Sequence, residues 1–164
     1  MRTKTIFTLL LVFLLATVVT NTGPTSAAAA AESSAFGAGS FFFQNEEVVF
    51  SFTAVSSGGT AGKGTAQFDY LATQTTVTVK LSCVKIDLSQ GAVTMSGKVQ
   101  ESSDTDFPKN ANVVFGAIDG SLSPIPFFAD RITPLFVRAA GVNCNDGLPS
   151  TVLRPEEGQV VIVP

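Results

Sequence analysis

The stretch TTVTVKLSCVKI, residues 75–86, decides the fold class because its side chains alternate strictly between apolar and polar. The apolar positions share one face: Val77, Val79, Leu81 and Cys83. A period of two is the pattern of a β-strand with one buried face, and the density of β-branched residues disfavours a helix. The sequence therefore predicts a strand with one wet and one dry side.

The same alternation continues on both sides of this stretch. Before it, residues 46–54 and 63–70 alternate around a Gly58-Gly59 turn, and after it residues 93–99 follow a turn at Gln90-Gly91. In residues 63–70 the only tyrosine of the chain, Tyr70, falls on the apolar face. Short connections of this kind favour neighbouring antiparallel strands.

The second half of the chain gives weaker strand signals. Residues 113–118 form a short apolar run, and residues 160–163 predict a terminal strand that is covered on both sides. Prolines interrupt residues 121–128, which we expect to form a loop, and Pro134 limits residues 130–137 to an edge or broken strand. We expect one all-β domain over residues 46–164, an antiparallel β-sandwich or a small β-barrel.

The N-terminus has the three parts of a secretory signal peptide. Arg2 and Lys4 precede an apolar run over residues 6–19, and a small-residue tract follows at residues 26–31. We expect cleavage among the alanines of residues 28–31, which leaves a secreted, extracellular chain; an uncleaved N-terminal anchor is the alternative. Residues 32–45 are expected to form a flexible N-terminal segment, in which the rings of residues 41–43 either begin a strand or form an exposed patch.

Two cysteines, Cys83 and Cys144, lie in the exported part of the chain. An even number of cysteines outside the cytoplasm favours a disulfide, and here only one intramolecular pairing exists. Two buried free thiols or one reactive cysteine are the alternatives. A reactive cysteine normally needs a neighbouring histidine or another cation to form its thiolate, and the chain has no histidine.

The composition argues against several classes of function. Without histidine a Ser-His-Asp triad is impossible, and the commonest metal ligand is missing. Removal of residues 1–31 leaves 8 basic and 13 acidic residues, so the charge balance does not favour nucleic acid as a partner. We expect no cofactor, no metal and, after cleavage, no membrane partner.

Four residues in one Pro-rich region are the candidates for a binding surface: Asp119, Phe127, Phe128 and Asp130. Asp119 and Asp130 flank the loop and could converge as a carboxylate pair, as a glycosidase requires. More ordinary roles are also open to these residues: the two acids could be solvated turn residues, and the two phenylalanines could pack in the core or against the loop. Two loops contain oxygen ligands of the kind that calcium takes, although neither has the spacing of a calcium-binding loop: Asp104, Asp106, Asn143, Asn145 and Asp146.

The order of these landmarks resembles a known kind of domain. The landmarks are residues 49–54, Gly62-Lys63-Gly64, residues 68–70, residues 77–84, Gly91-Ala92-Val93 with Ser96-Gly97, Asp119-Gly120, Asp130-Arg131-Ile132 and residues 158–162. They are similar to those of small secreted bacterial domains of the post-COAP type, from about Phe50 to Val163. The resemblance implies a β fold and a secreted protein, and it implies no activity.

We expect a non-catalytic, secreted β-domain that acts as a surface interaction or structural module. An extracellular protein or a cell-wall polymer is the partner that such a role implies. The alternatives are a carboxylate-dependent extracellular hydrolase, with Asp119 and Asp130 as its acid pair, and a small extracellular inhibitor that presents one loop.

Overall fold

Antiparallel strands account for the regular structure of the chain in this computed structural model, which describes residues 32–125, 129–139, 141 and 143–164. The strands are β1 (Ser33–Phe43), β2 (Glu46–Ser56), β3 (Ala61–Tyr70), β4 (Thr75–Asp87), β5 (Ala92–Ser102), β6 (Asn112–Ile118), β7 (Arg131–Ile132), β8 (Phe136–Arg138) and β9 (Glu157–Val163). No helix occurs in the described residues. The all-β antiparallel prediction is confirmed.

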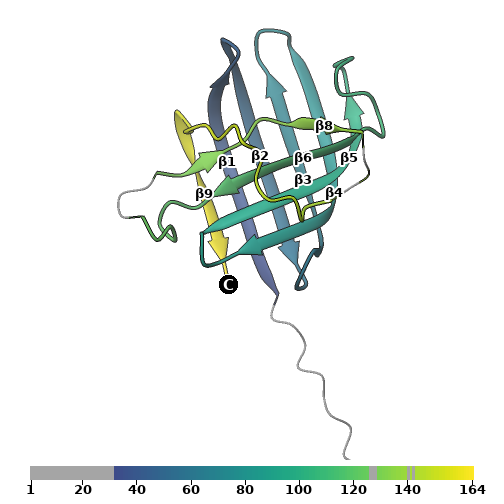
Figure 1. The fold of residues 1–164 in the computed structure, drawn as a ribbon. Coiled ribbons are helices and arrows are strands. Elements are labelled where there is room, and N and C mark those ends of the chain that lie inside the picture. The colour runs from purple at the N-terminus through teal and green to yellow at the C-terminus, as the bar shows by residue number, and fades with distance from the viewer. Residues whose placement is uncertain (1–31, 126–128, 140, 142) are drawn as a thin grey trace, which may run out of the picture.

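The strands form one sheet that curls until it nearly closes into a barrel. Its order is β7-β6-β5-β4-β3-β2-β1-β9. Strand β8 also pairs with β6, on the edge that β7 occupies and opposite the edge that pairs with β5. In Figure 1, β4, β5 and β6 cross in front of β1, β2 and β3, so the two halves of the sheet face each other. Strands β1 to β6 follow one another as hairpins, whereas β9 returns from the end of the chain to pair with β1.

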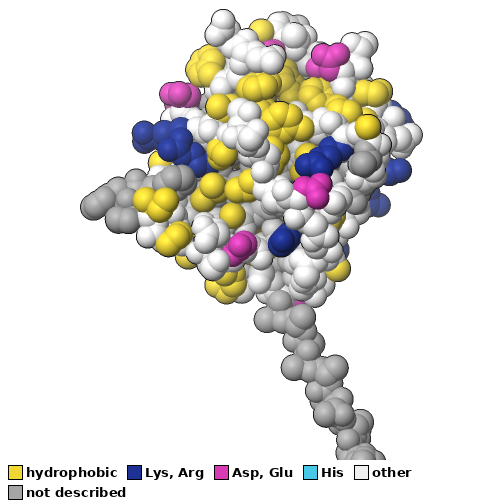
Figure 2. Space-filling view, in the orientation of Figure 1, with side chains coloured by type: hydrophobic (Ala, Val, Ile, Leu, Met, Phe, Trp, Pro, Cys, Tyr) yellow, Lys and Arg dark blue, Asp and Glu magenta, His cyan; other side chains and the backbone are white. Residues whose placement is uncertain are grey.

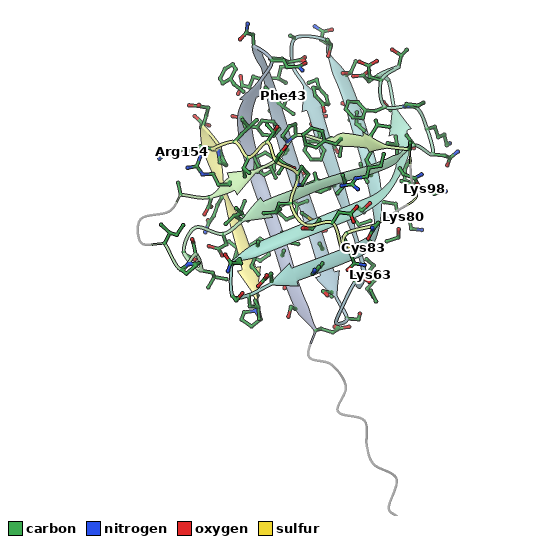
Figure 3. All side chains as sticks on the ribbon, viewed as in Figure 1. Phe43, Lys63, Lys80, Cys83, Lys98 and Arg154 are labelled. Carbon is green, nitrogen blue, oxygen red and sulfur yellow. A yellow bond between two sulfur atoms is a disulfide. The ribbon has the colours of Figure 1, made fainter. Side chains whose placement is uncertain are left out.

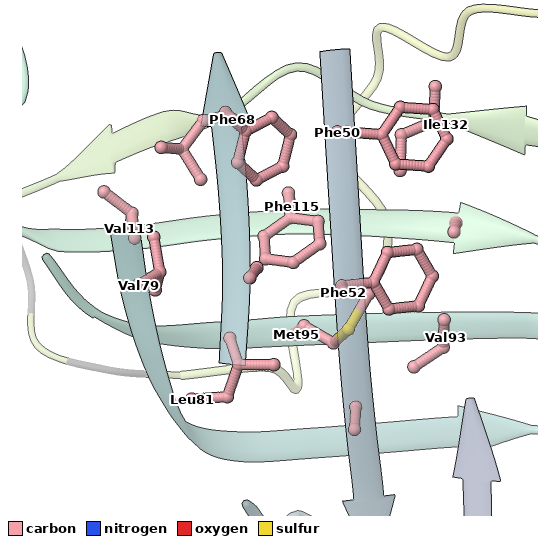
Figure 4. Close-up of a cluster of buried hydrophobic side chains, with 14 of the residues drawn as sticks. Phe50, Phe52, Phe68, Val79, Leu81, Val93, Met95, Val113, Phe115 and Ile132 are labelled. Atoms are coloured by element: carbon pink, nitrogen blue, oxygen red, sulfur yellow. The ribbon is translucent and has the colours of Figure 1, made fainter. Parts of the chain in front are cut away.

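The space between the two halves of the sheet is filled by aromatic and aliphatic side chains. Phe115 of β6 packs edge-on against Phe68 of β3 and Phe52 of β2, with ring centroids 5.0 and 6.0 Å apart. Figure 4 shows these rings together with Phe50 and Met95, all of which are at most 3% exposed. Side chains therefore fill this part of the barrel interior, which is a packed core and not a cavity for a ligand.

Two irregularities let β4 and β5 bend sharply enough to cross the other strands. The pairing register of β4 and β5 shifts between Thr78 and Val79 and again between Leu81 and Cys83. At Gly97 an added Cβ would lie only 2.1 Å from the backbone oxygen of Lys80, so a side chain has no room there. Bulges and glycines at such positions increase the local twist and help a sheet to close.

The structure corrects two expectations at the edges of the sheet. Residues 32–45, expected to be flexible, contain β1, which pairs with β2 over its whole length and with β9 over residues 34–40. Gly37 and Gly39 have no side chain, which allows this close packing and explains why the sequence of the segment resembles a linker. Strand β9 is covered on one face only, since Val160 and Ile162 are buried but Val163 is 43% exposed.

A disulfide joins the sheet to the C-terminal segment. Cys83 on β4 and Cys144 are bonded, with Cα atoms 5.9 Å apart, as predicted. Within the described residues there is no helix with the length and hydropathy needed to cross a bilayer. The expected signal peptide, residues 1–31, lies outside the described residues. The disulfide is compatible with a secreted protein.

Candidate functional site

The structure brings Asp119 and Asp130 together at the seam where the barrel closes. Asp119 follows β6 and accepts a hydrogen bond at Oδ2 from the backbone N–H of Ile162, 3.0 Å away. Asp130 precedes β7 and accepts one at Oδ2 from the N–H of Val160, at 2.8 Å. The N–H of Gly120 donates to the other oxygen of Asp130, at 2.8 Å, and so links the two acids.

These contacts give both carboxylates a structural task. Strand β9 pairs only with β1, so its outer edge has no strand to accept its N–H groups. The two acids take the place of that missing strand, and Asp119, only 4% exposed, also accepts hydrogen bonds from the N–H and the hydroxyl of Ser121. Because both oxygens of each carboxylate hold backbone groups, the geometry favours closure of the barrel as their role. Hydrolysis by this pair stays a prediction.

The other sequence candidates contribute less. Phe127 and Phe128 lie outside the described residues. The acids considered as calcium ligands make local contacts: Asp104 accepts from the N–H of Asp106, and Asp146 pairs with Arg138. In the described part of the chain no three Asp, Glu or Cys side chains are grouped so that they could hold a metal ion.

A concave feature that was not predicted from the sequence lies on the outer face of the sheet. This outer groove, about 670 Å³ in volume, crosses β9, β1, β2, β3 and β4. It is lined by Phe36, Gly37, Ala38, Ser51, Phe52, Thr53, Thr65, Ala66, Gln67, Thr78, Gln159 and Val161. None of these residues is charged; about half carry hydroxyl or amide groups, and the others are apolar residues or glycine.

The strand register aligns outward-facing residues of the groove into rows that run across the strands. The row that we call the outer row contains Val161, Phe36, Thr53, Thr65, Lys80 and Lys98, each the direct partner of the next. Six strands at a spacing of about 4.8 Å give the row a length of about 24 Å along the curved surface. It begins with apolar side chains, continues with two hydroxyls and ends with two ammonium groups.

The aromatic end of the outer row is exposed. The ring of Phe36 is 45% exposed, and Val161 lies beside it on β9. The hydroxyls of Thr53 and Thr65 are 3.5 Å apart in the middle of the row. An exposed ring next to a run of neutral hydrogen-bonding groups offers both an apolar and a polar contact to the same ligand.

At the basic end of the outer row, two positively charged side chains lie directly opposite each other on neighbouring strands. Lys80 and Lys98 are direct cross-strand partners, an arrangement that destabilises a sheet unless something neutralises it. Lys63 and Lys80 line a second hollow of about 510 Å³, which borders the outer groove at Thr53, Thr65 and Thr78.

Figure 3 shows Lys63, Lys80 and Lys98 on the same side of the barrel. No carboxylate of the described residues forms a salt bridge with any of these three lysines. No ion pair within the described residues therefore neutralises these three ammonium groups.

Comparisons with known proteins do not assign the chain to a family: no family model matches it, and neither a characterised protein nor a solved structure matches significantly. The resemblance to post-COAP-type domains stays a prediction. The candidate site is thus defined by the geometry of this chain alone. The alternating Ser/Thr-rich strand faces were the sequence signal for it, but alternation does not say which side chains of different strands stand next to each other.

Proposed function

We propose that this protein is a non-catalytic, extracellular binding module that holds an acidic polysaccharide of the cell surface along the outer row. The observation that carries the proposal is the row itself, because it joins an exposed ring, a neutral hydroxyl-rich groove and an unpaired cluster of lysines on one continuous face. The proposal rests on the arrangement of these groups and on the exported location that the N-terminal sequence predicts.

Each part of the row suits a different part of such a polymer. Sugar rings have an apolar face that can pack on the ring of Phe36, and their hydroxyls can exchange hydrogen bonds with Thr53, Thr65 and Gln67. Carboxylate groups farther along the polymer would meet Lys80 and Lys98. The length of about 24 Å leaves room for several sugar units, so the affinity would come from many weak contacts.

The same observations argue against catalysis at this surface. The residues that line the outer groove include no acid and no nucleophile with a base beside it. Asp119 and Asp130 accept hydrogen bonds from the free edge of β9. General acid–base chemistry needs a titratable group within hydrogen-bond reach of the reacting atom. We therefore infer binding without turnover.

Affinity electrophoresis of the purified protein tests the proposal. We expect gels that contain polygalacturonate to retard it at low salt, and gels that contain hydroxyethylcellulose to retard it much less. Lys80→Gln/Lys98→Gln should weaken binding to the acidic polymer about tenfold and flatten its dependence on salt. Phe36→Ala should weaken binding about fivefold at any ionic strength, since a stacking contact is worth about 1 kcal/mol.

A matched control removes one positive charge away from the row. Lys109→Gln lies in the loop between β5 and β6 and should leave retardation unchanged once the change in net charge is corrected for. Equal retardation by the two polymers, retardation by neither, or no effect of the lysine pair would contradict the proposal.

A further inference from the structure

A second cavity, independent of the outer groove, lies at one end of the barrel. Its walls come from the β1–β2 turn, the β3–β4 turn and the loop that follows β5. This end pocket has a volume of about 370 Å³, which is the size of a site for a small organic group. It lies at the upper end of Figure 1, where Figure 2 shows acidic side chains in magenta close to hydrophobic ones in yellow.

One side of the end pocket is aromatic. Tyr70 stacks on Phe107 with ring centroids 5.8 Å apart and an angle of 24° between the planes, and Phe43 also lines the cavity. Stacked rings of this kind offer their electron-rich faces and edges to a ligand with an apolar stem. Aromatic walls favour an organic cation over a hydrated metal ion.

Tyr70 supplies a polar group to the pocket. Most of its side chain is buried, its hydroxyl is not among the fully buried polar atoms, and it forms no hydrogen bond with the described residues. The phenol is therefore free to exchange a hydrogen bond with a ligand in the pocket. Burial, together with the charges of Asp104 and Glu46, raises the pKa of Tyr70, which keeps the phenol neutral and able to donate or accept.

The charge of the end pocket has one sign. Glu46, Asp104 and Asp106 line it, and no lysine or arginine does. The N–H and hydroxyl of Thr73 donate to Oε1 of Glu46 at 3.0 and 3.1 Å, while the N–H of Asp106 donates to Oδ1 of Asp104 at 2.8 Å. These bonds orient the two carboxylates and leave the second oxygen of each without a hydrogen bond from the described residues.

We propose that the end pocket binds an alkylammonium group, such as the side chain of a lysine presented by another molecule. The ammonium group would donate to the free oxygens of Glu46 and Asp104 and to the hydroxyl of Tyr70, and its aliphatic stem would lie against Phe107 and Phe43. An ammonium group has three donors and needs several acceptors that converge on it. This inference does not depend on the polysaccharide site, which lies on a different part of the surface.

Titrations followed by ¹H–¹⁵N NMR spectra of the whole protein test the inference. The probe is N-acetyl-lysine amide, and its uncharged counterpart is N-acetyl-norleucine amide. We expect the lysine derivative to shift the amide signals of residues 43–47, 70–75 and 103–107 with a Kd of about 1 mM, which corresponds to about 4 kcal/mol of binding free energy. The norleucine derivative should bind at least tenfold more weakly.

Two nearly isosteric variants and one control separate the contributions. Asp104→Asn should weaken binding about tenfold, and Tyr70→Phe about threefold, while dispersed spectra show that the fold is retained. Asp87→Asn removes an exposed carboxylate outside the pocket and should change nothing. Equal binding of the two derivatives, unaltered binding to Asp104→Asn, or the same shifts with Ca²⁺ at lower concentration would overturn the inference.

The source of the ammonium group is a separate arm of the same experiment. n-Butylammonium carries the same head group without the peptide. Similar affinities for n-butylammonium and N-acetyl-lysine amide would indicate a site for free amines, whereas a clear preference for the latter would indicate a protein partner. Both results support an alkylammonium site, and absence of binding by either probe contradicts it.

Discussion

Two regions of the molecule are held together in different ways. Strands β1 to β6 form a meander in which every strand is joined to its neighbours along the chain by a long backbone ladder. Among the described residues of the closing segment, 119–164, the backbone pairings are short ones at β7 and β8, a single bridge between Ile132 and Leu153, and one longer ladder between β9 and β1. This segment depends on side chains instead: a disulfide at Cys144, and the carboxylates of Asp119 and Asp130.

The contrast shows that local and long-range parts of a fold are stabilised by different chemistry. A hairpin brings its own backbone partners, so the meander needs little besides alternation and turn residues. Strand β9 reaches β1 across more than a hundred residues, and its free edge is satisfied by two acids that are 43 and 30 residues away from the groups they accept. Charge-assisted hydrogen bonds and a covalent link offset the entropy of this long closure.

The largest effect is expected when the covalent link of the closing segment is removed. Cys83→Ala/Cys144→Ala should lower the free energy of unfolding by about 4 kcal/mol, because the bond encloses a 61-residue loop. Denaturant unfolding of the variant and of the native protein measures the loss. Reductant should destabilise the native protein by a similar amount and leave the variant unaffected; an identical midpoint with and without reductant would show that the segment does not need its link.

The next largest effect concerns the carboxylates that replace a strand. Asp119→Ala should lower the free energy of unfolding by about 3 kcal/mol, because it leaves the buried N–H of Ile162 without an acceptor. The control, Asp69→Ala, removes an acid on the outer face of the meander that accepts only from side chains, and should lower it by less than about 1 kcal/mol. If both substitutions lowered the free energy of unfolding equally, acids of the closing segment would be no more important for stability than acids of the meander.

Native-state hydrogen exchange compares the regions without any substitution. The amides of Val160 and Ile162 in β9 should exchange at least about tenfold faster than those of Val79 and Leu81 in β4, because the closing segment can open without unfolding the meander. Indistinguishable protection in β9 and β4 would mean that the barrel opens only as one cooperative unit.

The smallest effect is confined to a turn of the meander and sharpens the contrast between buried and exposed acids. Hydrogen bonds from Ser89, with a smaller contribution from Lys85, hold the pKa of Asp87 below its usual value. The stability that these bonds add is present above the pKa of the unfolded carboxyl and is lost as the pH falls through the lower folded pKa. Ser89→Ala should raise the pKa of Asp87 toward its usual value, as NMR titration of its carboxyl carbon will show, without a measurable change in global stability. An unchanged pKa would contradict the assignment.

Much of the meander could be predicted because alternation is a local property. Residues 75–86 place Val77, Val79 and Leu81 in the core, and all three are at most 1% exposed. The disulfide followed from the number of cysteines and the expected compartment. The same reasoning failed for β1, where glycine and alanine suggested a linker but actually make room for β9 and for the ring of Phe52.

The candidate sites could not be predicted in the same way. The sequence showed that Asp119 and Asp130 flank one loop and could converge, but it did not show that they accept hydrogen bonds from β9. The outer row and the end pocket each combine residues from strands or loops that are distant in the sequence. Their side chains become neighbours only through the register of several ladders, and no single segment contains that information.

By itself, the amino-acid sequence determined that the segments of β2 to β5 extend and which of their faces avoid water. It also determined that the two cysteines can form only one intramolecular disulfide. Those properties depend on the order of apolar and polar residues within about ten positions. Only the tertiary structure decided that two carboxylates bind the free edge of β9 and that Phe36 lies in one cross-strand row with Lys80 and Lys98. It also decided that Tyr70 and three acids line one pocket. Closure of the sheet and the register of its strands bring together residues that are far apart in the chain. The contacts between these residues form only when the whole sheet is assembled.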